Sequence, residues 1–202
     1  MKYIFMFRGL KMILSGITKK QVKDRTAAGK IGKTYREILE RAGQMDPASP
    51  LVGAYGLAAW FISMNRHDGL SPEENCRILE EGLKNSRLYK AFMGSADDYF
   101  SEKKMEFRRD WAAKTQSPEF QKRFPNDWEV ELLEKGPDYD FGFDYLQCGI
   151  CKLCREEGCP ELAEYLCRLD YMTSDLMGVG LRRTETLAEG SPKCDFRFYK
   201  YR

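Results

Sequence analysis

The spacing of apolar residues predicts that the first half of the chain is helical. Between residues 20 and 45, apolar residues recur at the three- and four-residue intervals of an α-helix: Ile31, Tyr35, Ile38 and Leu39. Ser49 and Pro50 are suited to the N-cap and the first position of a second helix, which should end near Arg66. Similar signals, including a capping box that starts at Ser71, predict further helices over residues 71–83, 86–93 and 97–114.

After residue 115 the apolar residues recur at every second position, which is typical of β-strands. The segments "DWEVELLE" and "YDFGFDYLQC" alternate in this way and are joined by the turn "KGPD", so they predict a hairpin. The segments "VGLRRTETLAEG" and "KCDFRFYKYR" predict a second strand pair, with two short helices between the pairs. The expected fold class is α+β, with a helical N-terminal half and a small C-terminal antiparallel sheet of about four strands covered by helices.

The length and charge distribution favour one domain with a basic extension. The 202 residues are 43% hydrophobic and 32% charged, a globular composition, and residues 46–202 are expected to form a single α+β domain. Residues 1–45 hold eleven Lys and Arg against three acidic residues, so we expect a basic helical leader that packs on the domain or extends from it. No nucleic-acid motif accompanies this charge, and a solvated helix face with a subunit contact, as in a homo-oligomer, explains it better than nucleic-acid binding.

The sequence predicts neither a membrane span nor an export signal. The longest apolar run, residues 51–64, is shorter than the roughly 20 residues that a transmembrane helix needs. The apolar segment at residues 1–7 is too short for the hydrophobic region of a signal peptide. We therefore expect a cytoplasmic protein whose seven cysteines are mostly reduced.

The stretch "CGICKLCREEGCP", residues 148–160, raises the alternative of an iron-sulfur or zinc site. Cys148, Cys151 and Cys154 have the spacing of a cluster loop, but the gap to Cys159 is one residue too long, and His67 is the only histidine. A short amphipathic helix explains more of these residues, because the apolar ones then share one face and the charged ones the other. On this interpretation Cys151 and Cys154 are buried apolar residues, and no metal is expected.

The segment "PELAEYLCRLDYM" predicts a helix on which a thiol lies beside a carboxylate. Cys167 and Asp170 are three residues apart and are therefore neighbours on one side of this helix. Such a pair can supply a nucleophile and a proton acceptor, or the carboxylate alone can activate water. A buried cysteine beside a solvated aspartate is the structural alternative.

Three motifs in the last third of the chain resemble the L-2-amino-thiazoline-4-carboxylic acid hydrolase family: "LCRLD", "RRTETLAEG" and "CDFRF". The resemblance implies that a small cyclic amidine ring is opened hydrolytically to an N-carbamoyl amino acid, without a cofactor. Water or an enzyme nucleophile would add to the ring carbon between nitrogen and sulfur, and the C–S bond would break. The site must then supply an activated nucleophile, a proton for the ring nitrogen and a cation for the substrate carboxylate.

The candidates for the catalytic roles are two cysteines and one aspartate. Cys167 or Cys194 could be the nucleophile, and Asp170 could be the base. Two other functions remain open on the sequence: a binding or regulatory module that holds a small ligand without chemistry, and the metal protein considered above.

The candidates for substrate binding lie on or beside the predicted strands. Arg183 or Arg182 could clamp a carboxylate with two parallel hydrogen bonds, although strand alternation turns only one of them inward. Asp195 could hold the substrate amine or act as a second acid. Cys148 and Tyr145, at the end of the second predicted strand, complete the expected set.

Overall fold

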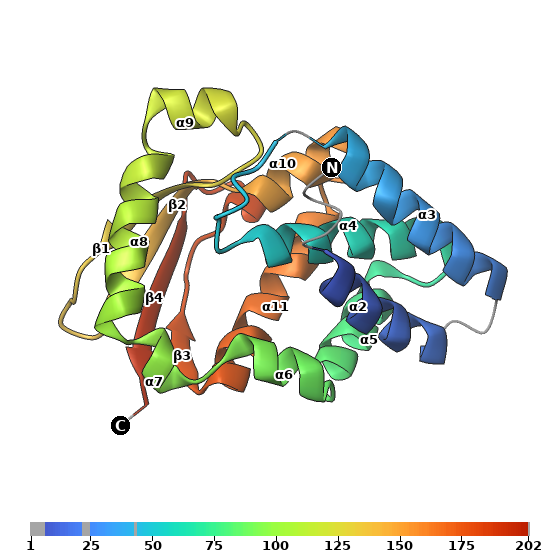
Figure 1. The fold of residues 1–202 in the computed structure, drawn as a ribbon, viewed down its shortest axis with the longest axis horizontal. Helices are drawn as coiled ribbons and strands as arrows, with labels where there is room; N and C mark the ends of the chain where they lie inside the picture. Colours follow the sequence, from blue (N-terminus) through green and yellow to red (C-terminus); the bar gives the residue numbers. More distant parts are fainter. Residues whose placement is uncertain (1–6, 22–24, 43, 202) are drawn as a thin grey trace.

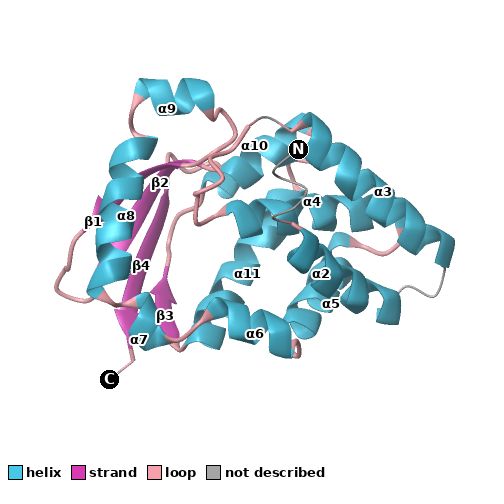
Figure 2. Cartoon of the chain, in the orientation of Figure 1, coloured by secondary structure: helices cyan, strands magenta, loops and turns pink. Residues whose placement is uncertain are grey.

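The fold is α+β, as the sequence predicts. The computed structural model describes residues 7–21, 25–42 and 44–201. A four-stranded antiparallel sheet lies at one side of the molecule and a group of helices at the other, with the chain's last long helix between them (Figures 1 and 2). Within the described residues, none of the helices has the length and apolar composition needed to cross a membrane.

The first half of the chain is helical, but several helix ends differ from the prediction. Its helices are α2 (Arg8–Gln21), α3 (Arg25–Arg41), α4 (Val52–His67), α5 (Pro72–Lys84), α6 (Arg87–Met93), α7 (Ala96–Tyr99), α8 (Glu102–Thr115) and α9 (Pro118–Arg123). The capping box at Ser71 is confirmed, because its side chain and that of Glu74 each accept the other's backbone N–H. The sequence prediction missed α9, and it expected α2 only as part of a helical leader whose helix ends were not predicted.

Two of the predicted helix boundaries are wrong for identifiable reasons. Ser49 does not cap α4, because its hydroxyl donates to Asp127 Oδ1 at 3.0 Å; Leu51 is the N-cap instead. The helix expected over residues 97–114 is two helices, and Ser101 is the N-cap residue of the second. The Ser49 side chain is engaged in a hydrogen bond to a distant residue instead of capping the helix. Ser101 starts a new helix inside a segment whose pattern looks like one continuous helix.

The helices of the basic segment pack against α4 and α5 and share their hydrophobic core. Their buried residues include Leu14, Ile31, Tyr35 and Ile38. The Trp60 ring of α4 meets Tyr35 edge-on at a centroid distance of 5.1 Å, and its Nε1 donates to Thr18 Oγ1 at 2.9 Å. The charged side chains that the structure describes in this segment therefore lie on the outside of helices whose inner faces are apolar.

The sheet consists of β1 (Glu129–Leu133), β2 (Phe141–Gln147), β3 (Val179–Arg182) and β4 (Cys194–Lys200), in the order β1-β2-β4-β3. Both predicted strand pairs are confirmed, since β1 pairs with β2 and β3 pairs with β4, all antiparallel. The second pair is shorter than its alternating pattern, because the chain leaves the sheet after Arg182. A short 3₁₀ helix, η1 (Leu187–Glu189), lies in the connection.

One face of the sheet is aromatic and covered by helices. The strand register places six side chains of β2 and β4 opposite one another on this face: Phe141 with Phe198, Phe143 with Phe196, and Tyr145 with Cys194. The Tyr99 ring at the end of α7 lies 5.7 Å from that of Phe141, and Trp111 of α8 lies 5.7 Å from Phe143. The opposite face is polar, with Asp144, Asp195 and Arg197 in the alternate positions.

Two helices connect the strand pairs, α10 (Gly149–Glu156) and α11 (Leu162–Met177). Cys151, Leu153 and Cys154 are buried on the inner face of α10, which confirms the amphipathic-helix interpretation. Gly158, just beyond α10, has a φ of 70°, a conformation that favours glycine at a helix C-terminus. The predicted inner face of α11 is also confirmed, with Leu162, Leu166 and Leu169 buried.

Candidate active site

Cys148 lies where β2 ends and α10 begins, and it is the N-cap residue of that helix. Its carbonyl accepts the first helical hydrogen bond, from Lys152 N at 3.1 Å. The Cys151 thiol, together with the backbone N–H groups of Cys151 and Ile150, lowers the pKa of the Cys148 thiol, although burial opposes this. Unpaired N–H groups and the helix dipole favour negative charge at a helix N-terminus, so Cys148 is placed to react as a thiolate.

Gly149 fixes the position of Cys148, because the start of α10 packs closely against the chain before β1. A Cβ at residue 149 would lie 2.5 Å from the Asn126 carbonyl oxygen and 2.9 Å from the Trp128 ring. We expect Gly149→Ala to lower the free energy of unfolding by about 1–3 kcal/mol through overpacking, measured by denaturant unfolding. The matched control is Gly53→Ala in α4, where no atom lies within 4 Å. That variant should be neutral or more stable by up to about 1 kcal/mol, and equal stabilities of the two variants would contradict the packing argument.

Asp170 of α11 forms an ion pair with Arg183, the residue after β3. Arg183 Nη1 donates to Asp170 Oδ2 at 2.8 Å, and Nη2 donates to the Cys167 carbonyl at 3.1 Å. The guanidinium also lies 5.0 Å from the Phe196 ring centroid and 5.1 Å from that of Tyr171. Arg183 is thus held on several sides, and its contacts fix the position of the Asp170 carboxylate.

Burial raises the pKa of Asp170 to about 6, although Arg183 lowers it in part. The Asp170 side chain nevertheless keeps 39% of its surface exposed, against 7% for Arg183. The carboxyl is therefore surrounded by protein on most sides but still reached by water. Near neutral pH such a group is mostly ionised and can accept a proton and give it back, as a general base does.

The remaining catalytic candidates lie around the same carboxylate. Tyr145 and Cys194 lie directly opposite each other in β2 and β4, and Cys148 follows Tyr145 by three residues. The Cys167 carbonyl binds Arg183, the partner of Asp170. We refer to six residues as the Cys148 cluster: Tyr145, Cys148, Cys167, Asp170, Arg183 and Cys194. It forms where β2, α10, α11, the segment after β3 and the start of β4 meet.

The pKa values of the Cys167 and Cys194 thiols are shifted in the opposite direction from that of Cys148. Burial raises the pKa of the Cys194 thiol to about 11 and that of Cys167 further still. Cys194 Sγ also accepts a hydrogen bond from Leu187 N at 3.1 Å. These two thiols stay protonated at neutral pH, so Cys148 is better suited than either of them to be a nucleophile.

Arg182 and Asp195, two of the predicted substrate-binding residues, do not join the cluster. The register pairs Arg182 with Arg197 and Asp195 with Asp144, which places both side chains on the polar face of the sheet. Arg182 forms an ion pair with Asp138, and Asp195 accepts the N–H groups of Thr184 and Glu185. Asp195 therefore shapes the turn that carries Arg183 instead of facing a substrate beside Cys148.

The cysteines of α10 separate into two pairs at its two ends. At one end Cys148 lies with Cys151; at the other the Cys154 thiol interacts with that of Cys159. Among the residues that the structure describes, no three side chains of His, Cys, Asp or Glu are grouped so that they could hold a metal ion. The spacing that resembles a cluster loop thus falls on a helix, with one cysteine pair at its start and another near its end.

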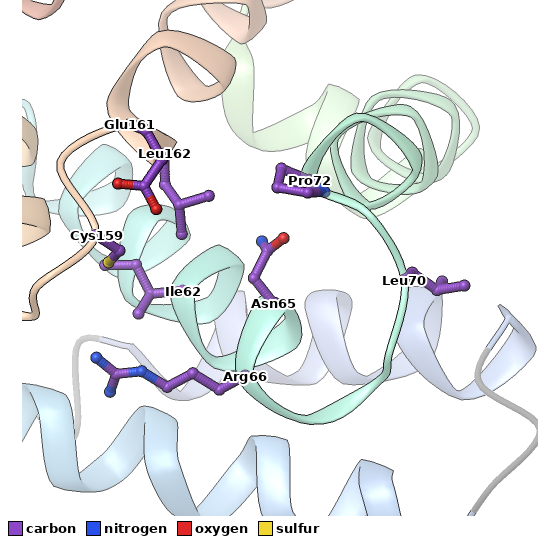
Figure 3. A pocket seen from close by; sticks show the side chains of 8 residues that line it. All are labelled: Ile62, Asn65, Arg66, Leu70, Pro72, Cys159, Glu161 and Leu162. Atoms are coloured by element: carbon purple, nitrogen blue, oxygen red, sulfur yellow. The ribbon is translucent and has the colours of Figure 1, made fainter.

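Cys159 lines a separate pocket of about 210 Å³ between α4 and the junction of α10 with α11 (Figure 3). The Cys154 thiol, and to a smaller extent Arg66, lowers the pKa of Cys159. The Arg66 guanidinium is already used, because Nη1 donates to Glu157 Oε2 at 2.8 Å and Nη2 to the Glu157 carbonyl at 2.7 Å. Its lining includes the Glu161 carboxylate but no residue of the three motifs that carry the family resemblance, so this pocket is the weaker candidate.

Sequence reasoning missed two residues next to the cluster, Tyr99 and Arg108. Arg108 Nη1 donates to the Tyr99 carbonyl at 2.7 Å, and the guanidinium lies 4.2 Å from the Tyr99 ring centroid. Arg108 follows Met105 by three residues and precedes Trp111 by three, and all three are buried. A basic residue on the apolar face of a helix was the signal available in the sequence.

Comparison with known proteins identifies the family of this chain. The family model of L-2-amino-thiazoline-4-carboxylic acid hydrolase matches residues 53–198, which span α4 to β4 and include all six residues of the Cys148 cluster. Neither the curated proteins nor the solved structures give a match to this chain.

Proposed function

The chain belongs to the L-2-amino-thiazoline-4-carboxylic acid hydrolase family, and we propose that it opens the ring of such a cyclic amidine with Cys148 as nucleophile. The observation that carries this proposal is the position of Cys148 at the N-terminus of α10, in the same cluster as the Asp170–Arg183 pair. A thiol with a lowered pKa and a carboxyl with a pKa of about 6 are the two groups that the reaction needs.

In the first step, the Cys148 thiolate adds to the ring carbon between nitrogen and sulfur. The bond from this carbon to the ring sulfur then breaks, and the substrate sulfur leaves as a thiolate that takes up a proton. The product of this step is an open chain joined to Cys148 through the same carbon. A thiolate is a good leaving group, so the main requirement is a nucleophile that is ionised at neutral pH.

In the second step, water adds to the carbon that is bonded to Cys148, and Asp170 accepts a proton from that water. The bond to Cys148 breaks, its thiolate is regenerated, and an N-carbamoyl amino acid with a free thiol is released. Asp170 suits this role because only Oδ2 binds Arg183, while Oδ1 has no hydrogen-bond partner among the described residues. The two steps consume one water and need no oxidant or reductant.

The other members of the cluster assist in three ways. Arg183 is a positioning residue, since its two hydrogen bonds hold Asp170 and the backbone of α11. Cys167 and Cys194 remain thiols and provide an apolar lining. Tyr145, whose pKa burial raises well above the usual value, stays protonated and can donate a hydrogen bond to the substrate.

The test is to incubate the purified protein with L-2-aminothiazoline-4-carboxylate and to follow free thiol together with the carbamoyl product. We expect one thiol and one N-carbamoyl-L-cysteine for each substrate consumed. Binding of the substrate without thiol release would refute the proposal and would indicate a binding module. The metal content of the same sample separates both outcomes from a metal protein.

A further inference from the structure

We infer that Arg108 of α8, with the Tyr99 ring beneath it, is the subsite that binds the carboxylate of the substrate. The inference rests on the proposed function, because it assumes that the Cys148 cluster holds the reacting ring. It replaces Arg183 and Arg182, the carboxylate clamps expected from the sequence, with a residue that the family resemblance does not mark.

Arg108 is a buried cation without an anionic partner. Only 8% of the residue is exposed, and it forms no ion pair within the part of the chain that the structure describes. Its Nη1 donates to the Tyr99 carbonyl at 2.7 Å and meets Met105 Sδ at 3.5 Å. Burial without a carboxylate is costly for a guanidinium, so a buried arginine of this kind is a natural site for an anion from outside the chain.

The free donors of Arg108 remain accessible. Nε and Nη2 bind no carboxylate or carbonyl among the described residues, although the Tyr99 side chain also interacts with the guanidinium. Neither atom is fully enclosed by protein. The guanidinium lies 4.2 Å from the Tyr99 ring centroid and 4.5 Å from that of Phe141, so its orientation is fixed by stacking. A guanidinium held in this way presents Nε and Nη2 side by side, the arrangement that binds a carboxylate with two hydrogen bonds.

Aromatic rings of β2 connect Arg108 to the Cys148 cluster. The guanidinium lies 4.5 Å from the Phe141 ring centroid, which is 5.8 Å from that of Phe143. The Phe143 centroid is in turn 5.6 Å from that of Tyr145, a member of the cluster. Arg108 therefore lies on the same aromatic face of the sheet as the cluster, and the substrate would lie along this face with its carboxylate toward Arg108.

The other nearby cations already bind carboxylates or carbonyl groups of the protein. Arg183 is occupied by Asp170 and the Cys167 carbonyl. Arg197 and Lys193 bind Asp144 on the opposite face of the sheet. Arg183 thus already holds a carboxylate and a carbonyl, whereas Arg108 holds no carboxylate among the described residues.

The experiment compares L-2-aminothiazoline-4-carboxylate with its neutral carboxamide, using the wild type, Arg108→Gln and Arg109→Gln. Arg109 is the matched control, because it is the next residue of α8 but is exposed and paired with Glu102 and Glu134. We expect the wild type to prefer the carboxylate by about 100-fold in kcat/KM. Arg108→Gln should lose most of this preference by raising KM for the carboxylate, with little change for the carboxamide, while Arg109→Gln keeps it.

Binding of the same two compounds, measured by calorimetry, keeps this inference separate from the proposed function. If the wild type releases no thiol, the proposed function fails, but a preference for the carboxylate that depends on Arg108 would still support the subsite. If the wild type does not distinguish the two compounds, the subsite is refuted without any variant. Equal losses on both compounds in Arg108→Gln would also refute it, because they would show a merely structural role.

Discussion

Cys148→Ser is expected to lower kcat/KM for L-2-aminothiazoline-4-carboxylate by at least about 1,000-fold, measured as thiol release. The serine hydroxyl fills nearly the same space, but it does not ionise near neutral pH as a thiol at a helix N-terminus does. The fold should be unchanged, which circular dichroism and thermal unfolding can verify.

The matched control for this substitution is Cys159→Ser, at the other end of the same helix. Cys159 also has a lowered pKa, but it lines the pocket beside α4 and not the Cys148 cluster. The control should retain activity within roughly threefold, as expected for a substitution outside the site. A large loss in Cys159→Ser with little loss in Cys148→Ser would move the reaction to the other pocket.

Asp170→Asn is expected to lower kcat by about 100- to 10,000-fold, the usual contribution of a general base. Because only the ionised carboxyl accepts a proton, the wild-type rate should rise with pH as Asp170 loses its proton near pH 6. Asparagine cannot titrate, so the variant should lack this rise. The measurement is the pH dependence of kcat for both proteins.

Asp175→Asn is the control on the same helix, since Asp175 is exposed and its carboxylate accepts a hydrogen bond from the Tyr201 hydroxyl at 3.4 Å. It should keep both the rate and the pH dependence. If Asp170→Asn retained the rise near pH 6, another group would be responsible for it, and Asp170 would be a structural partner of Arg183.

Local patterns were sufficient to predict most of the fold. The two-residue alternation predicts both strand pairs because each strand has an aromatic face against helices and a polar face outward. The helical spacing of apolar residues also predicts α3 and α11 correctly, because each helix has a buried face and a solvated face. The N-cap of α4 was not predictable, because the Ser49 hydroxyl is hydrogen-bonded to Asp127, which lies 78 residues later in the chain.

The site was predictable in part. The motifs that carry the family resemblance contain Cys167, Asp170, Arg183 and Cys194, and these residues do come together. The assignment of roles was not available, since the difference between Cys148 and Cys167 depends on which thiol lies at a helix N-terminus and which is surrounded by apolar groups. The pairing of Arg183 with Asp170, and the free donors of Arg108, likewise depend on contacts between distant elements.

The most direct test of the central claim is the mass of the protein after it reacts with substrate. Asp170→Asn should form the bond to Cys148 but hydrolyse it slowly, so mixing this variant with L-2-aminothiazoline-4-carboxylate should add the mass of one substrate. Peptide mapping should place the added mass on Cys148, and Cys148→Ser combined with Asp170→Asn should show none. A substrate-derived mass on Cys167 or Cys194, or turnover by Cys148→Ser at the wild-type rate, would contradict the assignment of Cys148 as the nucleophile.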